Sequence, residues 1–180
     1  MTARDAEVAG RVRKHWHEAV PDDRIAHLVK DATRGFVRAL QVRLAAHDVP
    51  MGHWTFLRIL WENDGLTQRE LSIEAGVMEP TTLIALRSME ALGYIRREHR
   101  GDNRKNQHVL LTPLGRRLKK KLVPLAEEVN AVAMRHLSEA EISTTRRCLL
   151  AMIDNLAREA EAVSLEQGVR RVRRPRAAVG

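Results

Sequence analysis

The spacing of apolar residues changes from helical to strand-like in one part of this sequence, and that change limits the possible folds most strongly. Residues 94–98 and 107–111 form two strand-like runs, whereas the segments around them repeat apolar positions every three or four residues. Between the runs, Gly101-Asp102-Asn103 has the composition of a turn. We therefore predict a β-hairpin inside an otherwise helical chain, a mainly α fold.

Helices are predicted on both sides of the hairpin. They cover about residues 8–20, 25–48, 51–63, 67–76 and 80–93, and two long ones follow from residue 113 and from residue 138. Two of these helices open with a capping box, Thr67 with Glu70 and Ser138 with Glu141. Gly76 is placed to end the short helix in the left-handed conformation.

The order of the middle elements is typical of a helix-turn-helix followed by a wing. A major groove about 12 Å wide admits one α-helix, so the start of the second helix is expected at the base edges. Pro80 is predicted at the first helical position, and Glu79 before it is a poor N-cap and an anion close to phosphates. The side chains expected to approach DNA from this helix are Pro80, Thr81, Thr82, Ala85, Arg87 and Ser88.

The net charge of +8 is confined to two segments. Residues 93–121 carry ten basic and two acidic side chains, and residues 168–180 carry five basic side chains and no acidic one. Phosphate contacts with counterion release require charge gathered in this way. We expect Arg100, Arg104 and Lys105 at the hairpin tip to contact a phosphate backbone or a minor groove. The alternative is a solvated basic hairpin without DNA.

Composition and motifs exclude several classes of protein. A single cysteine and scattered histidines offer neither a disulfide framework nor a metal site. No apolar run approaches the roughly 20 residues that span a bilayer. No glycine-rich phosphate loop or Gly-x-Ser-x-Gly elbow indicates an enzyme. We expect no catalytic residues, no cofactor, no metal and no membrane partner.

Several runs resemble the MarR family of winged helix-turn-helix transcriptional regulators. The resemblance covers about residues 25–155 and rests on the hairpin region and on two runs upstream of it. These runs are Gly93-Tyr94-Ile95-Arg96-Arg97, Asp102-Asn103-Arg104-Lys105, Leu111-Thr112-Pro113-Leu114-Gly115, Trp54-Thr55-Phe56-Leu57-Arg58 and Leu66-Thr67-Gln68-Arg69-Glu70-Leu71.

The resemblance implies a winged-helix homodimer on double-stranded DNA with a pseudo-palindromic operator, in the cytoplasm of a bacterium at its nucleoid. Arg104 would enter the minor groove, and Asp102 would orient the wing by pairing with a nearby basic group. The commonest wing of the family has two arginines after the aspartate, and here Asn103 replaces the first. From the matching upstream run, Thr67, Gln68 and Arg69 are added to the expected DNA contacts.

The expected domain organisation is a winged-helix lobe on a helical dimerisation region. Apolar stripes on helices at both chain ends have too little of their own lobe to cover them, so a second subunit is the natural cover. The arginine-rich tail, expected to be disordered, is solubilising, contacts the DNA backbone, or is an expression remnant. The segments are an N-terminal helical dimer arm at 1–20, a MarR-like domain at 21–165 with its winged helix-turn-helix at 51–112 and dimerisation helices at 22–48 and 113–165, and the tail at 166–180.

Three tryptophans in a chain with only 3% aromatic residues define a possible effector site. Ordinary core packing is one interpretation. The other is a pocket that stacks an aromatic ligand and pairs its carboxylate or phenolate with an arginine or histidine. The family resemblance implies such an effector between the long helices and the winged-helix lobe. The residues of this hypothesis are Trp16, His17, His53, Trp54, Arg58 and Trp61.

Together these features predict a homodimeric repressor that a small aromatic or phenolic acid, or its thioester, releases from its operator. The alternative is an architectural, nucleoid-type DNA-binding protein without an effector. A basic protein of the membrane surface is disfavoured, because the positive stretch lies in a hairpin rather than in an amphipathic helix.

Overall fold

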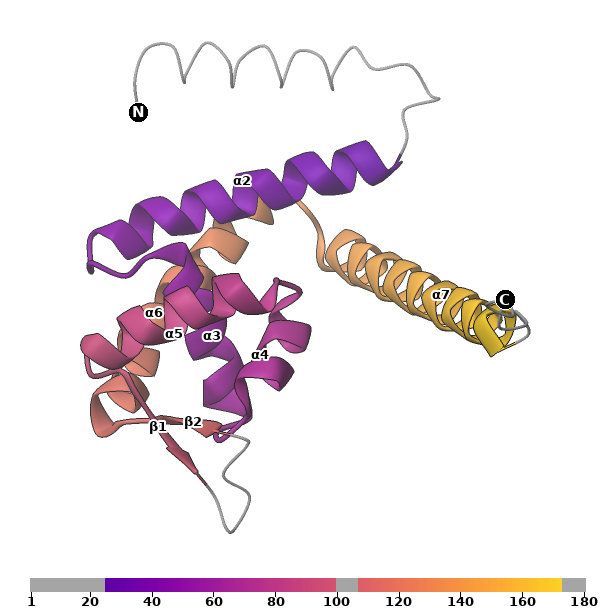
Figure 1. Ribbon diagram of the computed structural model, residues 1–180. Helices are drawn as coiled ribbons and strands as arrows, with labels where there is room; N and C mark the ends of the chain where they lie inside the picture. The colour runs from indigo at the N-terminus through magenta and orange to yellow at the C-terminus, as the bar shows by residue number, and fades with distance from the viewer. Residues whose placement is uncertain (1–24, 100–106, 173–180) are drawn as a thin grey trace, which may run out of the picture. The chain divides into compact units, whose positions relative to one another are not determined.

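The computed structural model describes residues 25–99 and 107–172, with side chains up to residue 165. The described chain is mainly α with a small two-stranded hairpin, as predicted (Figure 1). The elements are α2 (Ile25–Ala45), α3 (Met51–Glu62), α4 (Gln68–Ala75), α5 (Glu79–Ala91), β1 (Ile95–His99), β2 (Gln107–Leu111), α6 (Pro113–Ala133) and α7 (Glu139–Val172). The predicted helix at 8–20 lies outside the described residues.

The chain divides into two compact units, residues 1–133 and 134–180. In the first unit α3 is the central helix, because six of its twelve residues are buried and it contacts α2, α4, α5, α6 and β2. Apolar side chains nearly all round a helix are typical of such a buried position. Leu40 and Leu44 of α2 and Leu122 and Val129 of α6 join the same core.

The hairpin is held against α3 and α4 as well as within itself. Its strands are antiparallel, with Ile95 opposite Leu111 and His99 opposite Gln107, and the first strand begins one residue later than predicted. The backbone of Val109 also exchanges hydrogen bonds with the α3–α4 connection, donating to the Leu66 carbonyl at 2.8 Å and accepting from the Gly65 amide at 3.0 Å. The connection thus forms an isolated antiparallel bridge to β2, with Thr67 opposite His108.

A junction formed by α3, β2 and the start of α6 fixes the root of the hairpin. Asp64 accepts the Leu111 amide at 2.9 Å and pairs with Arg116 at 2.5 Å. The Trp61 indole donates to the Gly115 carbonyl at 2.9 Å. A Cβ atom at Gly115 would lie 2.1 Å from the Tyr94 carbonyl oxygen, so only glycine allows α6 to approach the backbone before β1 this closely.

The second unit consists mainly of α7, whose start is the predicted capping box. The Ser138 amide donates to the Glu141 carboxylate at 2.8 Å, and the Glu141 amide donates back to the Ser138 hydroxyl at 3.3 Å. The helix continues to Val172, so the predicted tail, placed from residue 166, begins as helix. Among the described residues, no helix combines the length and apolar character needed to cross a bilayer.

We predict that Gly115→Ala lowers the free energy of unfolding by roughly 1–3 kcal/mol, because its methyl group overlaps backbone that must then move. Urea denaturation followed by Trp fluorescence measures the change. Gly52→Ala is the control, since a Cβ there meets nothing within 4 Å and alanine is the better helix former. Equal stability of the two variants would show that the junction is not tightly packed.

Candidate nucleic-acid interface

The N-terminus of α4 is closed by the predicted capping box. The Thr67 amide and hydroxyl both donate to the Glu70 carboxylate at 2.7 Å, and the Glu70 amide donates to the Thr67 hydroxyl at 3.3 Å. The hydrogen bond from the Thr67 backbone is the main reason that the pKa of Glu70 lies below its ordinary value. The Thr67 hydroxyl is thus engaged within the cap, while Gln68 is half-buried and Arg69 exposed beside it.

The turn between α4 and α5 has the predicted left-handed glycine, but α5 begins earlier than expected. Gly76 has φ 65° and ψ 31°, and its amide donates to the Ile73 carbonyl. Met78 is the N-cap residue, so Glu79 occupies the first helical position and Pro80 the second. The expectation that Glu79 serves as a poor N-cap is therefore wrong. A carboxylate in the first turn complements the helix dipole instead.

The sequence spacing predicts Leu83, Leu86 and Met89 as the buried face of this helix, and the structure differs from that at a single residue. Thr82, Leu86 and Met89 are fully buried, a four- and three-residue spacing, whereas Leu83 is only half-buried. The Thr82 hydroxyl lies 2.7 Å from the Ser72 hydroxyl and thereby links α5 to α4. The expectation that Thr82 contacts bases is wrong, because its side chain has no exposed surface.

The solvent face of α5 retains the other polar residues predicted for it. Thr81, Arg87 and Ser88 are exposed, and so is Pro80. Ala85 is half-buried and packs against the core, so it does not face solvent as expected. Ile84, which was not among the predicted contacts, is exposed on the same face.

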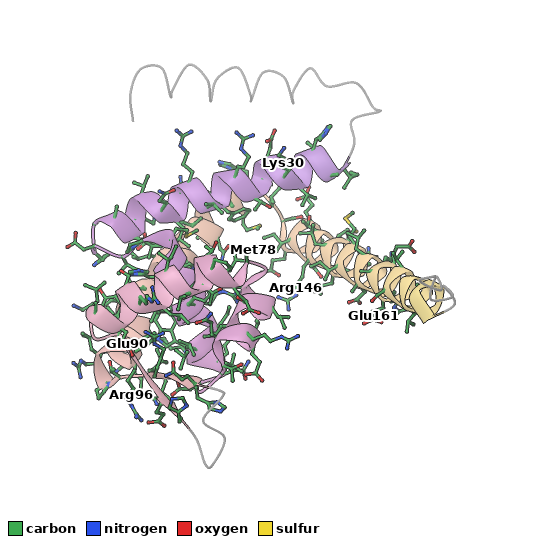
Figure 2. The ribbon with its side chains drawn as sticks, viewed as in Figure 1. Lys30, Met78, Glu90, Arg96, Arg146 and Glu161 are labelled. Atoms are coloured by element: carbon green, nitrogen blue, oxygen red, sulfur yellow. The ribbon has the colours of Figure 1, made fainter. Side chains whose placement is uncertain are left out.

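An ion pair ties the first hairpin strand to α5. The Arg97 guanidinium donates to the Glu90 carboxylate of α5, at 2.9 Å from Nε, and keeps the pKa of Glu90 below its ordinary value. Arg96 pairs with Glu98 on the same strand. Figure 2 labels Glu90 and Arg96 where α5 leads into β1. The predicted tip residues Arg100, Asp102, Arg104 and Lys105 lie outside the described residues.

A polar hollow of about 490 Å³ lies between the start of α4, the start of α5 and the hairpin. It brings Gln68 and Arg69 beside Arg97, although these residues are far apart in the sequence. Of the predicted DNA contacts, Thr67, Gln68 and Arg69 therefore face the hairpin strands. A second, open hollow of about 640 Å³ follows the turn, and Arg69 and Pro80 both line it.

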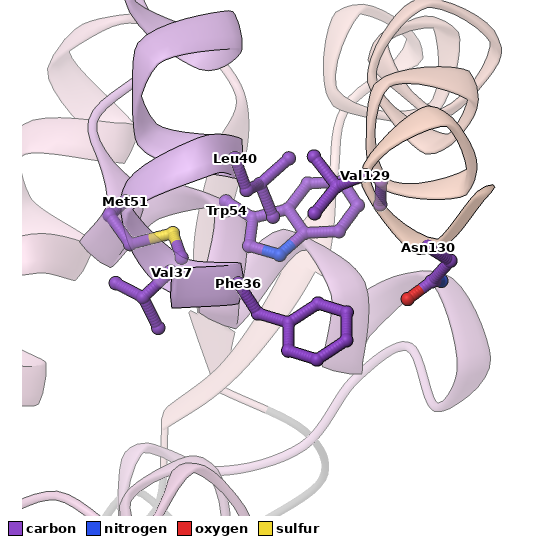
Figure 3. A pocket seen from close by; sticks show the side chains of 8 residues that line it. Phe36, Val37, Leu40, Met51, Trp54, Val129 and Asn130 are labelled. Carbon is purple, nitrogen blue, oxygen red and sulfur yellow. The ribbon is translucent and has the colours of Figure 1, made fainter. Parts of the chain in front are cut away.

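The structure separates the residues of the predicted effector site. Trp54 lines a cavity of about 240 Å³ between α2, α3 and α6, together with apolar side chains and Asn130 (Figure 3). Trp61 packs edge-on against Trp54 at 5.7 Å between ring centroids, but it does not line the cavity. Arg58 is exposed elsewhere on α3. Trp16 and His17 lie outside the described residues.

His53 is also absent from the cavity lining, although it is buried. Its ring lies edge-on to Tyr94 at 6.2 Å between centroids, and its Nδ1 has no hydrogen-bond partner. Burial lowers the pKa of His53, so the imidazole is neutral near pH 7 and is unsuited to pair with a carboxylate there. Of the four predicted effector residues that the structure describes, the cavity therefore includes Trp54 alone.

A helix-turn-helix followed by a hairpin packed on its second helix is a winged helix-turn-helix domain. Residues 49–107 match the model of the MarR family. The chain is 31% identical over 136 residues to the HTH-type transcriptional regulator TtmR of Methylorubrum extorquens, a match over 76% of this chain that spans 65% of that protein. Residues 49–107 therefore form a domain of the MarR type, and the matched relative is a regulator rather than an enzyme, in agreement with the expectation from sequence.

Solved structures show the same fold. A MarR-type protein of Listeria monocytogenes in complex with 26mer DNA is 22% identical, with a TM-score of 0.70 over 87% of this chain and 99% of that one. Bordetella bronchiseptica BpsR, described with regulation of its DNA binding by 6-hydroxynicotinic acid, is 21% identical, with a TM-score of 0.66 over 72% of this chain and 98% of that one.

We predict that Thr82→Val destabilises the protein by about 1–3 kcal/mol, since it leaves the buried Ser72 hydroxyl without its partner. Urea unfolding measures the loss. The double variant Ser72→Ala with Thr82→Val recovers part of it, and Thr81→Val, at an exposed position, stays within about 0.5 kcal/mol of the parent. A Thr82→Val protein of unchanged stability would contradict a structural role.

Proposed function

We propose that this protein is a homodimeric transcriptional repressor of the MarR type that binds a pseudo-palindromic operator and is released by a small aromatic or phenolic acid. The observation that carries the proposal is the arrangement of α5, whose solvent face presents Thr81, Arg87 and Ser88 while Arg97 holds the basic hairpin beside it. An α-helix with such a face fits a major groove, and a wing next to it reaches the neighbouring backbone or minor groove.

The excess positive charge of residues 93–121 falls on the wing and on the helix after it, and this location supports duplex DNA as the partner. Lys119, Lys120 and Lys121 in the first half of α6 are exposed, while Arg116 is engaged with Asp64. Half or more of protein–DNA hydrogen bonds go to phosphate and sugar, which position the protein without reading sequence. The solvent face of α5 then supplies the base contacts.

The apolar surface of α7 supports the homodimer. None of its described side chains is buried, and several large apolar ones are more than half exposed, among them Ile153, Leu156 and Leu165. A helix in water gains most of its stability from packing an apolar face. A second copy of the same chain is the partner that closes such a surface by two-fold symmetry.

The cavity beside Trp54 supports a small aromatic effector. Its volume of about 240 Å³ lies below the usual range for drug-sized ligands, so it suits a single aromatic ring better than a thioester with a large carrier. Trp54 and Phe36 offer aromatic surface, and Asn130 offers an amide to a carboxylate or phenol. BpsR, whose DNA binding is described as regulated by 6-hydroxynicotinic acid, shares the fold.

The cavity is placed where an occupant would alter the geometry of the winged helix. Residues of α2, α3 and α6 line it, and α3 is the central helix of the winged-helix core. A ligand that fits one spacing of these helices better than another shifts the population toward that spacing. The protein leaves the DNA if, at the favoured spacing, the distance between the two α5 helices of the dimer no longer matches the operator half-sites.

We predict that Arg104→Ala weakens binding to the operator by on the order of 1–3 kcal/mol, because it removes a minor-groove contact. Fluorescence anisotropy on a duplex selected from a random pool measures the affinity. Arg34→Ala on α2 is the control, since Arg34 pairs with Asp31 far from the wing in sequence. Full affinity of Arg104→Ala would show that the wing is misplaced, and equal affinity for random competitors would favour the architectural alternative.

We predict that benzoate, salicylate or 4-hydroxybenzoate quenches Trp fluorescence and weakens operator binding. Ala126→Phe, which fills the cavity from α6, abolishes both effects but retains operator binding. Ala131→Phe, at an exposed position of the same helix, leaves both effects in place. A flat titration across these acids, or quenching that survives Ala126→Phe, would count against the cavity as the effector site.

A further inference from the structure

Ile84 occupies the middle of the solvent face of α5. Its side chain is 71% exposed, although isoleucine belongs to the residue types most often buried in proteins. On a helix, residues three and four positions apart are neighbours, so Ile84 lies next to Thr81 and Arg87 and next to Pro80 and Ser88. It is thus an apolar side chain surrounded by the polar groups proposed to contact DNA.

The surroundings of Ile84 fit a base edge better than a protein surface. A protein interface has an apolar centre built from several side chains, whereas the neighbours of Ile84 on its helix face include two hydroxyls and a guanidinium. The major groove offers one strongly apolar group, the C5 methyl of thymine, and isolated apolar side chains contact it there. The hydroxyls of Thr81 and Ser88 and the Arg87 guanidinium can form hydrogen bonds with the edges of adjoining bases.

We propose that Ile84 determines specificity by packing on the C5 methyl of a thymine in each operator half-site. This inference rests on the proposed function, in which α5 enters the major groove. Arg87 follows Ile84 by three residues, about 4.5 Å along the helix axis. Base pairs are about 3.4 Å apart, so the thymine lies one or two base pairs from the pair that Arg87 contacts.

The experiment replaces thymine by deoxyuridine, which removes only the methyl group. Duplexes are first selected from a random pool with the full-length protein. Each thymine of the enriched half-site is then replaced in turn, and the affinity of the protein for each substituted duplex is measured. Loss of one buried methyl weakens binding about fourfold per half-site at one position. With Ile84→Ala, thymine and deoxyuridine at that position bind equally, whereas Ile84→Val retains most of the difference.

Ile73→Ala is the matched control, because Ile73 on α4 is 72% exposed but lies off the α5 face. This variant keeps the thymine preference of the parent protein. The inference is overturned if no thymine is sensitive to loss of its methyl, or if Ile84→Ala keeps the same sensitivity. Failure of the proposed function looks different, because then no duplex is enriched at all and the parent protein binds every sequence alike.

Discussion

The close approach of α6 to the hairpin root is the constraint on which the rest of the winged-helix unit depends. Gly115 leaves no room for a Cβ atom against the Tyr94 carbonyl, and Trp61 and Asp64 bond to the backbones of Gly115 and Leu111 across the same junction. These contacts set the direction in which both strands leave the core. The two hairpin strands therefore leave the core at a fixed angle to α3.

Contacts between polar side chains of neighbouring elements also position α5. The buried Thr82–Ser72 hydroxyl pair locks its start to α4, and the Arg97–Glu90 ion pair locks its end to β1. Separating the hydroxyl pair would leave a buried hydroxyl without a partner, which is costly. The Arg97–Glu90 ion pair is partly exposed and therefore contributes less. The solvent face of α5 is thus presented by a helix held at both ends, as recognition of base edges requires.

The sequence allowed prediction of much of this fold because its local signals agree with the tertiary structure. The capping boxes at Thr67 and Ser138 and the left-handed Gly76 depend on neighbouring residues only, and the structure confirms them. The prediction that Thr82 contacts DNA was wrong. Its hydroxyl is buried because Ser72 of another helix provides a hydrogen-bond partner, which sequence spacing does not reveal. The prediction that His53 and Arg58 line the effector pocket was also wrong. Sequence spacing does not show which face of α3 packs against α2 and α6.

We propose that two copies of this winged helix bind one operator through α5. Hydroxyl-radical footprinting of the full chain on a selected duplex tests it most directly. Two protected regions related by a two-fold axis, with centres about 34–36 Å apart, are the predicted result. A single protected patch, or uniform protection on every sequence, would contradict the account.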